Sequence, residues 1–153
     1  KEIALSMNCF DKVSFLDDKI GGEANRDVIG KTENLEKFVS EYTYLFVAIG
    51  NAEIRLNLLK KAEEAGYKIP VLISQRAYIS AYAQIMKGSI IEPMAVIQTG
   101  AVVSAGTIVS SGAVIRHNAF VGEGCHCDCN SVVMSGAAVP AMTKIECCSI
   151  YKK

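Results

Sequence analysis

A six-residue period fills the second half of the chain. Steps of six from residue 79 to residue 151 meet thirteen positions, and eleven of them are Ile or Val. Two residues before each, the side chain is always small: Ala, Ser, Thr or Cys. No α-helix has a period of six, whereas a hexapeptide period is typical of a parallel β-helix. We therefore expect flat faces of six residues, with the branched side chain inside and the small one at a tight corner, and three faces per coil of eighteen residues.

Charge separates the first half from this repeat. Charged residues number 23 among the first 76 and only 9 among the last 77. The first half alternates amphipathic segments, expected as helices over 1–7, 35–42 and 52–65, with apolar runs expected as strands over 13–16, 44–49 and 69–73. Solid apolar strands between helices indicate a small parallel sheet. We predict a Rossmann-like α/β domain over 1–75 and an all-β parallel β-helix over 76–153.

Composition narrows the classes of function. Lys and Arg balance Asp and Glu at 16 each, which argues against a nucleic-acid partner. No apolar run approaches the ~20 residues of a membrane span, and the charged start is unlike a signal peptide. Six Cys without secretory features favour reduced thiols. We expect a cytoplasmic protein without membrane insertion.

Polar residues follow two of the expected strands. Asp17 and Asp18 come after the first, and Gly50 and Asn51 after the second. Ligands of parallel sheets bind beyond the carboxyl ends of the strands, so these four residues are candidate binding residues. Asp-Asp is equally common in a solvated turn, and Asn51 is equally suited to capping the next helix.

A cluster of Cys and His at 125–129 suggests a zinc site, but the repeat argues against it. Cys125 occupies a small-residue position and Cys127 an inward position, so both are expected in the core. Structural zinc needs four convergent ligands. We predict no metal. Cys129 and Cys147 lie eighteen residues apart and are expected to stack on adjacent coils. A thiol pair or an incidental metal ion at these two residues is an alternative that the sequence leaves open.

Several motifs match one known family. The chain resembles hexapeptide acyltransferases that acetylate sialic acids and nucleotide-linked amino sugars, through Phe15-Leu16-Asp17-Asp18, Val47-Ala48-Ile49-Gly50-Asn51 with Glu53-Ile54-Arg55, and Val114-Ile115-Arg116-His117. The resemblance implies a left-handed coil, acetyl-CoA as cosubstrate, a nucleotide-sugar substrate and a role in surface glycan biosynthesis. It also implies a homotrimer with active sites between subunits.

The resemblance assigns a role to His117. It matches the general base that takes a proton from the attacking amine or hydroxyl during direct acetyl transfer, although on its own it would read as an exposed surface His. Asn118 stands where the family has an acidic residue. An amide can orient the imidazole but cannot stabilise its charged form. Whether the acceptor is an amine or a hydroxyl stays open.

The resemblance also assigns binding residues. His126 matches the contact to the acetyl thioester end of the cofactor, or is a polar corner side chain. Asp17 and Asp18 match the pair that binds uridine, and Gly50 matches a close approach of backbone to ligand. Further cofactor contacts are implied for Gly136, Lys144 and Cys147, with Lys144 expected beside His126 one coil later.

Two departures keep alternatives open. The family's first strand and Gly-rich loop do not occur in this sequence, and we expect a segment to precede Lys1. Because of that difference and of Asn118, a non-catalytic protein that binds a nucleotide or a partner is an alternative interpretation. A related acyltransferase with another donor or a non-sugar acceptor is a further alternative.

Overall fold

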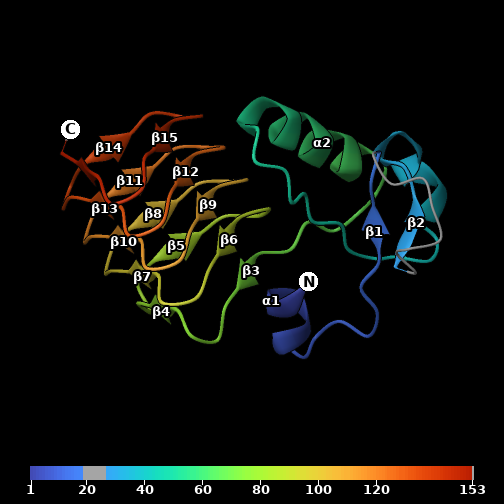
Figure 1. Cartoon of the computed structure of the whole chain (residues 1–153), viewed down its shortest axis with the longest axis horizontal. Coiled ribbons are helices and arrows are strands. Elements are labelled where there is room, and N and C mark those ends of the chain that lie inside the picture. The colour runs from blue at the N-terminus through green and yellow to red at the C-terminus, as the bar shows by residue number, and fades with distance from the viewer. Residues whose placement is uncertain (19–26, 153) are drawn as a thin grey trace.

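The computed structural model describes residues 1–18 and 27–152, with a coil of short strands at one end and the α/β half at the other (Figure 1). Helix α2 lies between the coil and a small sheet. The first half holds α1 (Glu2–Ser6), β1 (Phe15–Leu16), β2 (Val28–Gly30), the 3₁₀ helix η1 (Thr32–Phe38) and α2 (Ala52–Glu64). No described helix is long and apolar enough to cross a bilayer.

The second half is a left-handed parallel β-helix, as the repeat and the resemblance predicted. Its strands form three parallel sheets, ordered β16-β13-β10-β7-β4, β14-β11-β8-β5 and β15-β12-β9-β6-β3. Each strand pairs with strands eighteen residues away, as Val114 does with Val96 and Val132. The strands are β3 (Leu72–Ile73), β4 (Tyr78–Ile79), β5 (Gln84–Ile85), β6 (Ile90–Ile91), β7 (Val96–Ile97), β8 (Val102–Val103), β9 (Ile108–Val109), β10 (Val114–Ile115), β11 (Phe120–Val121), β12 (His126–Cys127), β13 (Val132–Val133), β14 (Ala138–Val139), β15 (Lys144–Ile145) and β16 (Ile150–Tyr151).

The core follows the repeat, but the corner is one residue from where we expected it. The inward side chains from Ile91 to Val133 have no exposed surface, and Cys127 is among them. The small residues from Ser89 to Ala137, Cys125 included, are also buried inside the coil. The tight turn is made by the residue before the small one. At every sixth position from Gly88 to Cys148 this residue has a positive φ. Glycine adopts that conformation without strain, and Asn more readily than most residues, which explains the Gly before so many of the small residues.

The α/β half differs from expectation in two strands. The strand predicted over 69–73 is β3, which pairs with β6 and so opens the coil rather than completing the first sheet. Ile73 is one step of six before Ile79, so the repeat begins earlier than residue 76. The strand predicted over 44–49 has no ladder among the described residues except a bridge from Tyr44 to Lys68. The described sheet of this half is the parallel pair β1-β2.

The helices match expectation more closely. Helices α1 and α2 occupy the segments predicted for them. The helix expected over 35–42 is instead η1, with non-helical angles at Asn34 (φ −101, ψ 15). Its first residue, Thr32, donates two hydrogen bonds to Asp18, which begins the helix earlier than predicted.

Helix α2 rests on one column of coil corners. Gly88, Gly106 and Gly124 are eighteen residues apart, and a Cβ at any of them would lie within 2.8–2.9 Å of a Leu56 or Leu59 methyl group. Only glycine leaves room for the helix at this distance. The column therefore fixes where the α/β half meets the coil.

Candidate functional site

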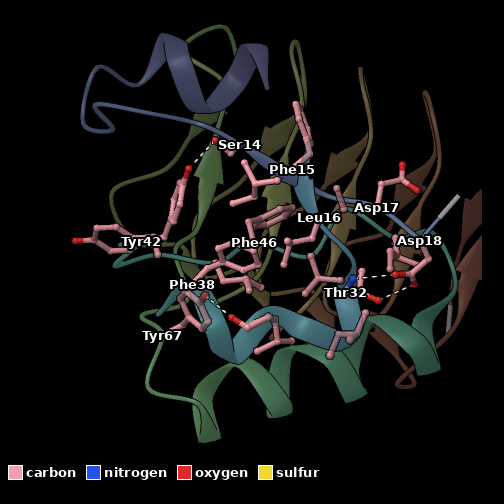
Figure 2. Close-up of a pocket in the computed structure, with 18 of the residues that line it drawn as sticks. Ser14, Phe15, Leu16, Asp17, Asp18, Thr32, Phe38, Tyr42, Phe46 and Tyr67 are labelled. Atoms are coloured by element: carbon pink, nitrogen blue, oxygen red, sulfur yellow. Dashed lines mark hydrogen bonds between the residues drawn. The ribbon is translucent and has the colours of Figure 1, made fainter. Parts of the chain in front are cut away.

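A cavity of about 700 Å³ opens in the α/β half, lined by β1, η1, α2 and the extended segment 44–49. Figure 2 shows its wall as mostly apolar side chains, with Asp17 and Asp18 together at one end. Ser14 and Tyr42 join by a 2.8 Å hydrogen bond at the other side, and Tyr67 donates to the Leu35 carbonyl at 2.7 Å. The cavity thus combines an apolar body with acidic groups at its rim.

Asp18 is held in place by η1. Its two carboxylate oxygens accept hydrogen bonds from Thr32 N at 2.8 Å and Thr32 Oγ1 at 2.6 Å. These two bonds lower the pKa of Asp18 from its ordinary value, so the ionised form that accepts hydrogen bonds is favoured. The Asp17 N–H donates to the Gly30 carbonyl across the sheet. Both acids remain at the carboxyl end of β1, as predicted.

Gly50 and Asn51 follow Ile49, which is the last residue of segment 44–49 to line the cavity. Asn51 is the N-cap of α2, because its Oδ1 accepts a hydrogen bond from Ile54 N at 3.0 Å. The Gly50 carbonyl accepts from Arg55 Nη1, and a Cβ at Gly50 would meet nothing within 4 Å. Backbone at Gly50 is therefore open to an approaching ligand.

His117 lies on the corner between β10 and β11, and its side chain is exposed. Its Nε2 is 3.1 Å from Ser135 Oγ on the next coil, and its carbonyl accepts a hydrogen bond from Gly136 N at 3.1 Å. His117, Ser135 and Gly136 therefore form one cluster. Because the Gly136 N–H is already used, that residue contributes open surface beside the imidazole rather than a hydrogen-bond donor.

Asn118 occupies a corner position, with φ at 58°. A Cβ at Gly100, one coil earlier, would lie 2.3 Å from the Asn118 amide oxygen, so the amide covers that glycine. Asn130 covers Gly112 in the same way. Among the described residues the imidazole of His117 contacts Ser135, not Asn118. The corner conformation gives a structural reason for Asn at this position.

His126 stacks on Lys144 across the β12–β15 ladder, as the eighteen-residue step predicted. Its Nε2 is 3.1 Å from Ser110 Oγ. Lys144 forms ion pairs with Asp128 at 3.5 Å and Glu146 at 2.9 Å. Burial lowers the pKa of His126, while Asp128 opposes this shift and Lys144 adds to it. The imidazole is therefore mostly neutral near pH 7.

The thiols divide by burial. Cys125 and Cys127 are in the core, and burial raises the pKa of Cys127 to about 12. Cys147 is exposed, with its Sγ 3.5 Å from that of Cys148, and the Cys148 N–H donates to the Cys129 carbonyl on the adjacent coil. In the described ranges no group of three or more His, Cys, Asp or Glu is placed to hold a metal ion.

Two contacts of this site were missed from sequence. Ser135 lies eighteen residues after His117, so the coil step that placed Lys144 beside His126 would also have found it. Arg55 is 1% exposed and contacts both halves of the protein. A charged residue in an amphipathic helix normally faces solvent, so no local signal indicated its burial.

Known proteins share this architecture. Residues 1–62 match the family described as the PglD N-terminal domain. The acetyltransferase domain of PglB from Neisseria gonorrhoeae, solved in complex with acetyl coenzyme A, superposes with a TM-score of 0.82 at 27% identity, covering 97% of this chain and 84% of that chain. No curated protein matches the chain by sequence.

Two further structures share the fold. A His-to-Asn mutant of perosamine N-acetyltransferase from Caulobacter crescentus, in complex with CoA and GDP-perosamine, has a TM-score of 0.77 at 20% identity over 92% of this chain and 76% of that one. WeeI from Acinetobacter baumannii has a TM-score of 0.60 at 16% identity over 93% and 87%.

The stacked parallel sheets of the coil and these similarities define the fold class: the protein has the left-handed β-helix architecture of the PglB acetyltransferase domain. The match of residues 1–62 to the PglD N-terminal domain agrees with that similarity.

Proposed function

We propose that the protein is an acetyl-CoA-dependent acetyltransferase that acts on a nucleotide-linked amino sugar or sialic acid in surface glycan biosynthesis. The α/β half holds the nucleotide sugar, and the coil, which begins at β3, holds acetyl-CoA. The observation that carries the proposal is the exposed imidazole of His117, fixed by Ser135 on a coil whose fold matches the PglB acetyltransferase domain across 97% of the chain.

His117 serves as general base. When Nε2–H donates to Ser135 Oγ, the Nδ1 lone pair takes a proton from the attacking amine or hydroxyl. The acceptor then bonds to the acetyl carbon, the carbon–sulfur bond breaks, and the proton passes to the leaving thiolate, which gives free CoA.

The surroundings of His117 suit a thioester. The Ser135 N–H makes no backbone hydrogen bond with another described residue, so it can donate to the carbonyl oxygen as negative charge develops there. Gly136 leaves open space beside it. His126, Lys144 and Cys147 continue along the same coils, where we place the rest of the cofactor.

The cavity suits a nucleotide. Its apolar wall can pack against a base, while Asp17 and the ionised Asp18 can accept hydrogen bonds from ribose hydroxyls or base N–H groups at the rim. Gly50 and Asn51 lie where the sugar would leave the cavity toward the coil.

Release of free CoA over a panel of UDP- and GDP-linked amino sugars and sialic acids tests the proposal. We expect at least one acceptor to stimulate release, and His117→Ala to lower kcat by about 10²–10⁴-fold. His126→Asn is the matched control: it is expected to raise the KM for acetyl-CoA more than it lowers kcat. CoA release by His117→Ala at the parent rate would overturn the mechanism, and no stimulation by any acceptor would overturn the activity.

A homotrimer with active sites between subunits is part of the proposal. One sheet of the coil presents an apolar outer column: Tyr78, Val96, Val114, Val132 and Ile150. Tyr78 and Ile150 are 63% and 56% exposed. Exposed apolar patches of this kind mark protein interfaces. Sedimentation of the parent at the mass of a trimer, and of Val114→Lys at the mass of a monomer, is the expected result; a monomeric parent would contradict it.

A further inference from the structure

Arg55 is the most buried charged side chain of the described residues, and it meets no carboxylate there. It lies in the first turn of α2 and is 1% exposed. Its hydrogen bonds all go to backbone carbonyls. Removing a charge from water costs several kcal/mol when no opposite charge is near, so these carbonyls must replace the lost hydration. Burial lowers the pKa of this guanidinium from its ordinary value.

The carbonyls belong to two separate parts of the molecule. Nη1 donates to Ile49 O at 2.7 Å and to Gly50 O at 2.8 Å, at the end of the segment that lines the cavity. Nε donates to Gly106 O at 2.6 Å, and Nη2 to Gly124 O at 2.7 Å, with Cys125 O at 3.4 Å. One planar group therefore ties the loop at Gly50 to two stacked corners of the coil.

The connection ends close to candidate site residues on both sides. Gly50 and Asn51 precede α2 at the rim of the cavity, while Gly124 and Cys125 lead directly into His126 on β12. The corners at Gly106 and Gly124 are also the ones that only glycine can occupy beneath α2. A planar guanidinium with five N–H donors can hold both sides at once, whereas a Lys ammonium has three donors on one atom.

We propose that Arg55 is a positioning residue: it fixes the Ile49–Gly50 loop on the coil, so that a nucleotide sugar bound in the cavity presents its acceptor group to the coil. The proposal rests on the proposed function for the identity of that ligand. It makes Arg55 a determinant of acceptor binding with no contact to the acetyl donor.

Kinetics of Arg55→Met and Arg55→Lys test this, with Arg76→Met, an exposed arginine, as the matched control. We expect Arg55→Met to raise the KM for the nucleotide sugar at least tenfold and the KM for acetyl-CoA less than threefold. Arg55→Lys should fall between Arg55→Met and the parent, and Arg76→Met should match the parent. An unchanged KM for the nucleotide sugar, or equal rises in both KM values, would overturn the proposal.

Hydrogen exchange gives a second measurement that does not depend on activity. In Arg55→Met, the amides at both ends of this loop, Leu45 N–H on Lys68 O and Ile54 N–H on Asn51 Oδ1, should exchange at least tenfold faster in peptides covering residues 44–54, while those covering β8 to β12 keep the parent rate. If the parent releases no CoA, the proposed function fails, and exchange alone decides the positioning role: unchanged exchange over 44–54 would refute it. If Arg55→Met does not fold, Arg55→Lys supplies the same comparison.

Discussion

The packing of α2 on the coil can be tested by adding one methyl group at either of two corner glycines. Gly88 and Gly136 have nearly the same φ, 71° and 70°, and each donates its N–H across one coil, to Pro70 O at 3.0 Å and His117 O at 3.1 Å. They differ in surroundings. A Cβ at Gly88 would lie 2.8 Å from Leu59 Cδ1, whereas one at Gly136 would meet nothing within 4 Å.

The magnitudes follow from this difference. Alanine in the left-handed region costs about 1–2 kcal/mol at either corner. At Gly88 the new methyl must also push Leu59, which is 6% exposed and has little room to move. Overpacking of this kind costs about 1–3 kcal/mol more. Gly88→Ala should therefore lower the free energy of unfolding by about 1–3 kcal/mol more than Gly136→Ala, and each 1 kcal/mol shifts the Tm by about 2–4 °C in a chain of this size.

Urea unfolding followed by circular dichroism, at equal protein concentration and with unchanged m values, measures both variants. Leu59→Ala in the Gly88→Ala background provides a control, because it removes the overlap and should make the two substitutions less than additive. Equal losses of stability in Gly88→Ala and Gly136→Ala would refute the contact between Leu59 and the corner. A Gly136→Ala variant as stable as the parent would refute the corner strain.

Three further outcomes are expected. Ser131→Ala should raise the free energy of unfolding by about 1 kcal/mol in denaturant titrations, because Ser131 Oγ is buried and has no hydrogen bond to another described residue. Ser89→Ala should lower it, since Ser89 Oγ donates to Ser104 O at 2.9 Å; a loss of stability in Ser131→Ala would contradict this. Because burial lowers the pKa of His126 below its ordinary 6.5, the unfolded chain binds that proton more readily and stability falls as pH drops below this value. The Tm loss on acidification from about pH 7.5 to about pH 5.5 should thus be smaller in His126→Gln than in the parent, and an equal loss would exclude His126 as the cause. Alkylation of the native protein followed by mass spectrometry should leave the thiols of Cys125 and Cys127 unmodified until denaturant is added, and should label the exposed thiols of Cys9, Cys147 and Cys148; native labelling of Cys127 would contradict the core assignment.

The coil could be predicted from sequence in detail because each position of the repeat has one local task. The inward residue fills the core, the small residue fits inside the coil, and the residue before it adopts a positive φ. Each of these requirements applies to a single residue, so each appears in the sequence as one residue type that recurs every six positions. The step of eighteen then gives the neighbours of any corner, including Lys144 beside His126.

The α/β half was less predictable because its elements depend on neighbours. Segment 44–49 has the composition of a buried strand, but a strand forms only where its backbone can pair with a neighbouring strand. Among the described residues this segment has one such pairing, the bridge from Tyr44 to Lys68. The burial of Arg55 depends on carbonyls 51 and 69 residues later in the chain. From the sequence, Asn118 could be compared only with the acidic residue that similar proteins have at this position. The structure shows instead that its amide lies against Gly100, one coil earlier.

The corner columns also limit how the length of this protein can change in evolution or by engineering. Gly88, Gly106 and Gly124 support α2 only while they stay eighteen residues apart. Removing a single hexapeptide between them would rotate every later residue by one face, and His117 would then point in a different direction relative to the α/β half. Removing or adding one full coil would preserve each face. Deletions and insertions within the coil should therefore be tolerated in whole turns, and a protein of this design can vary in height while the corner that carries His117 keeps its direction.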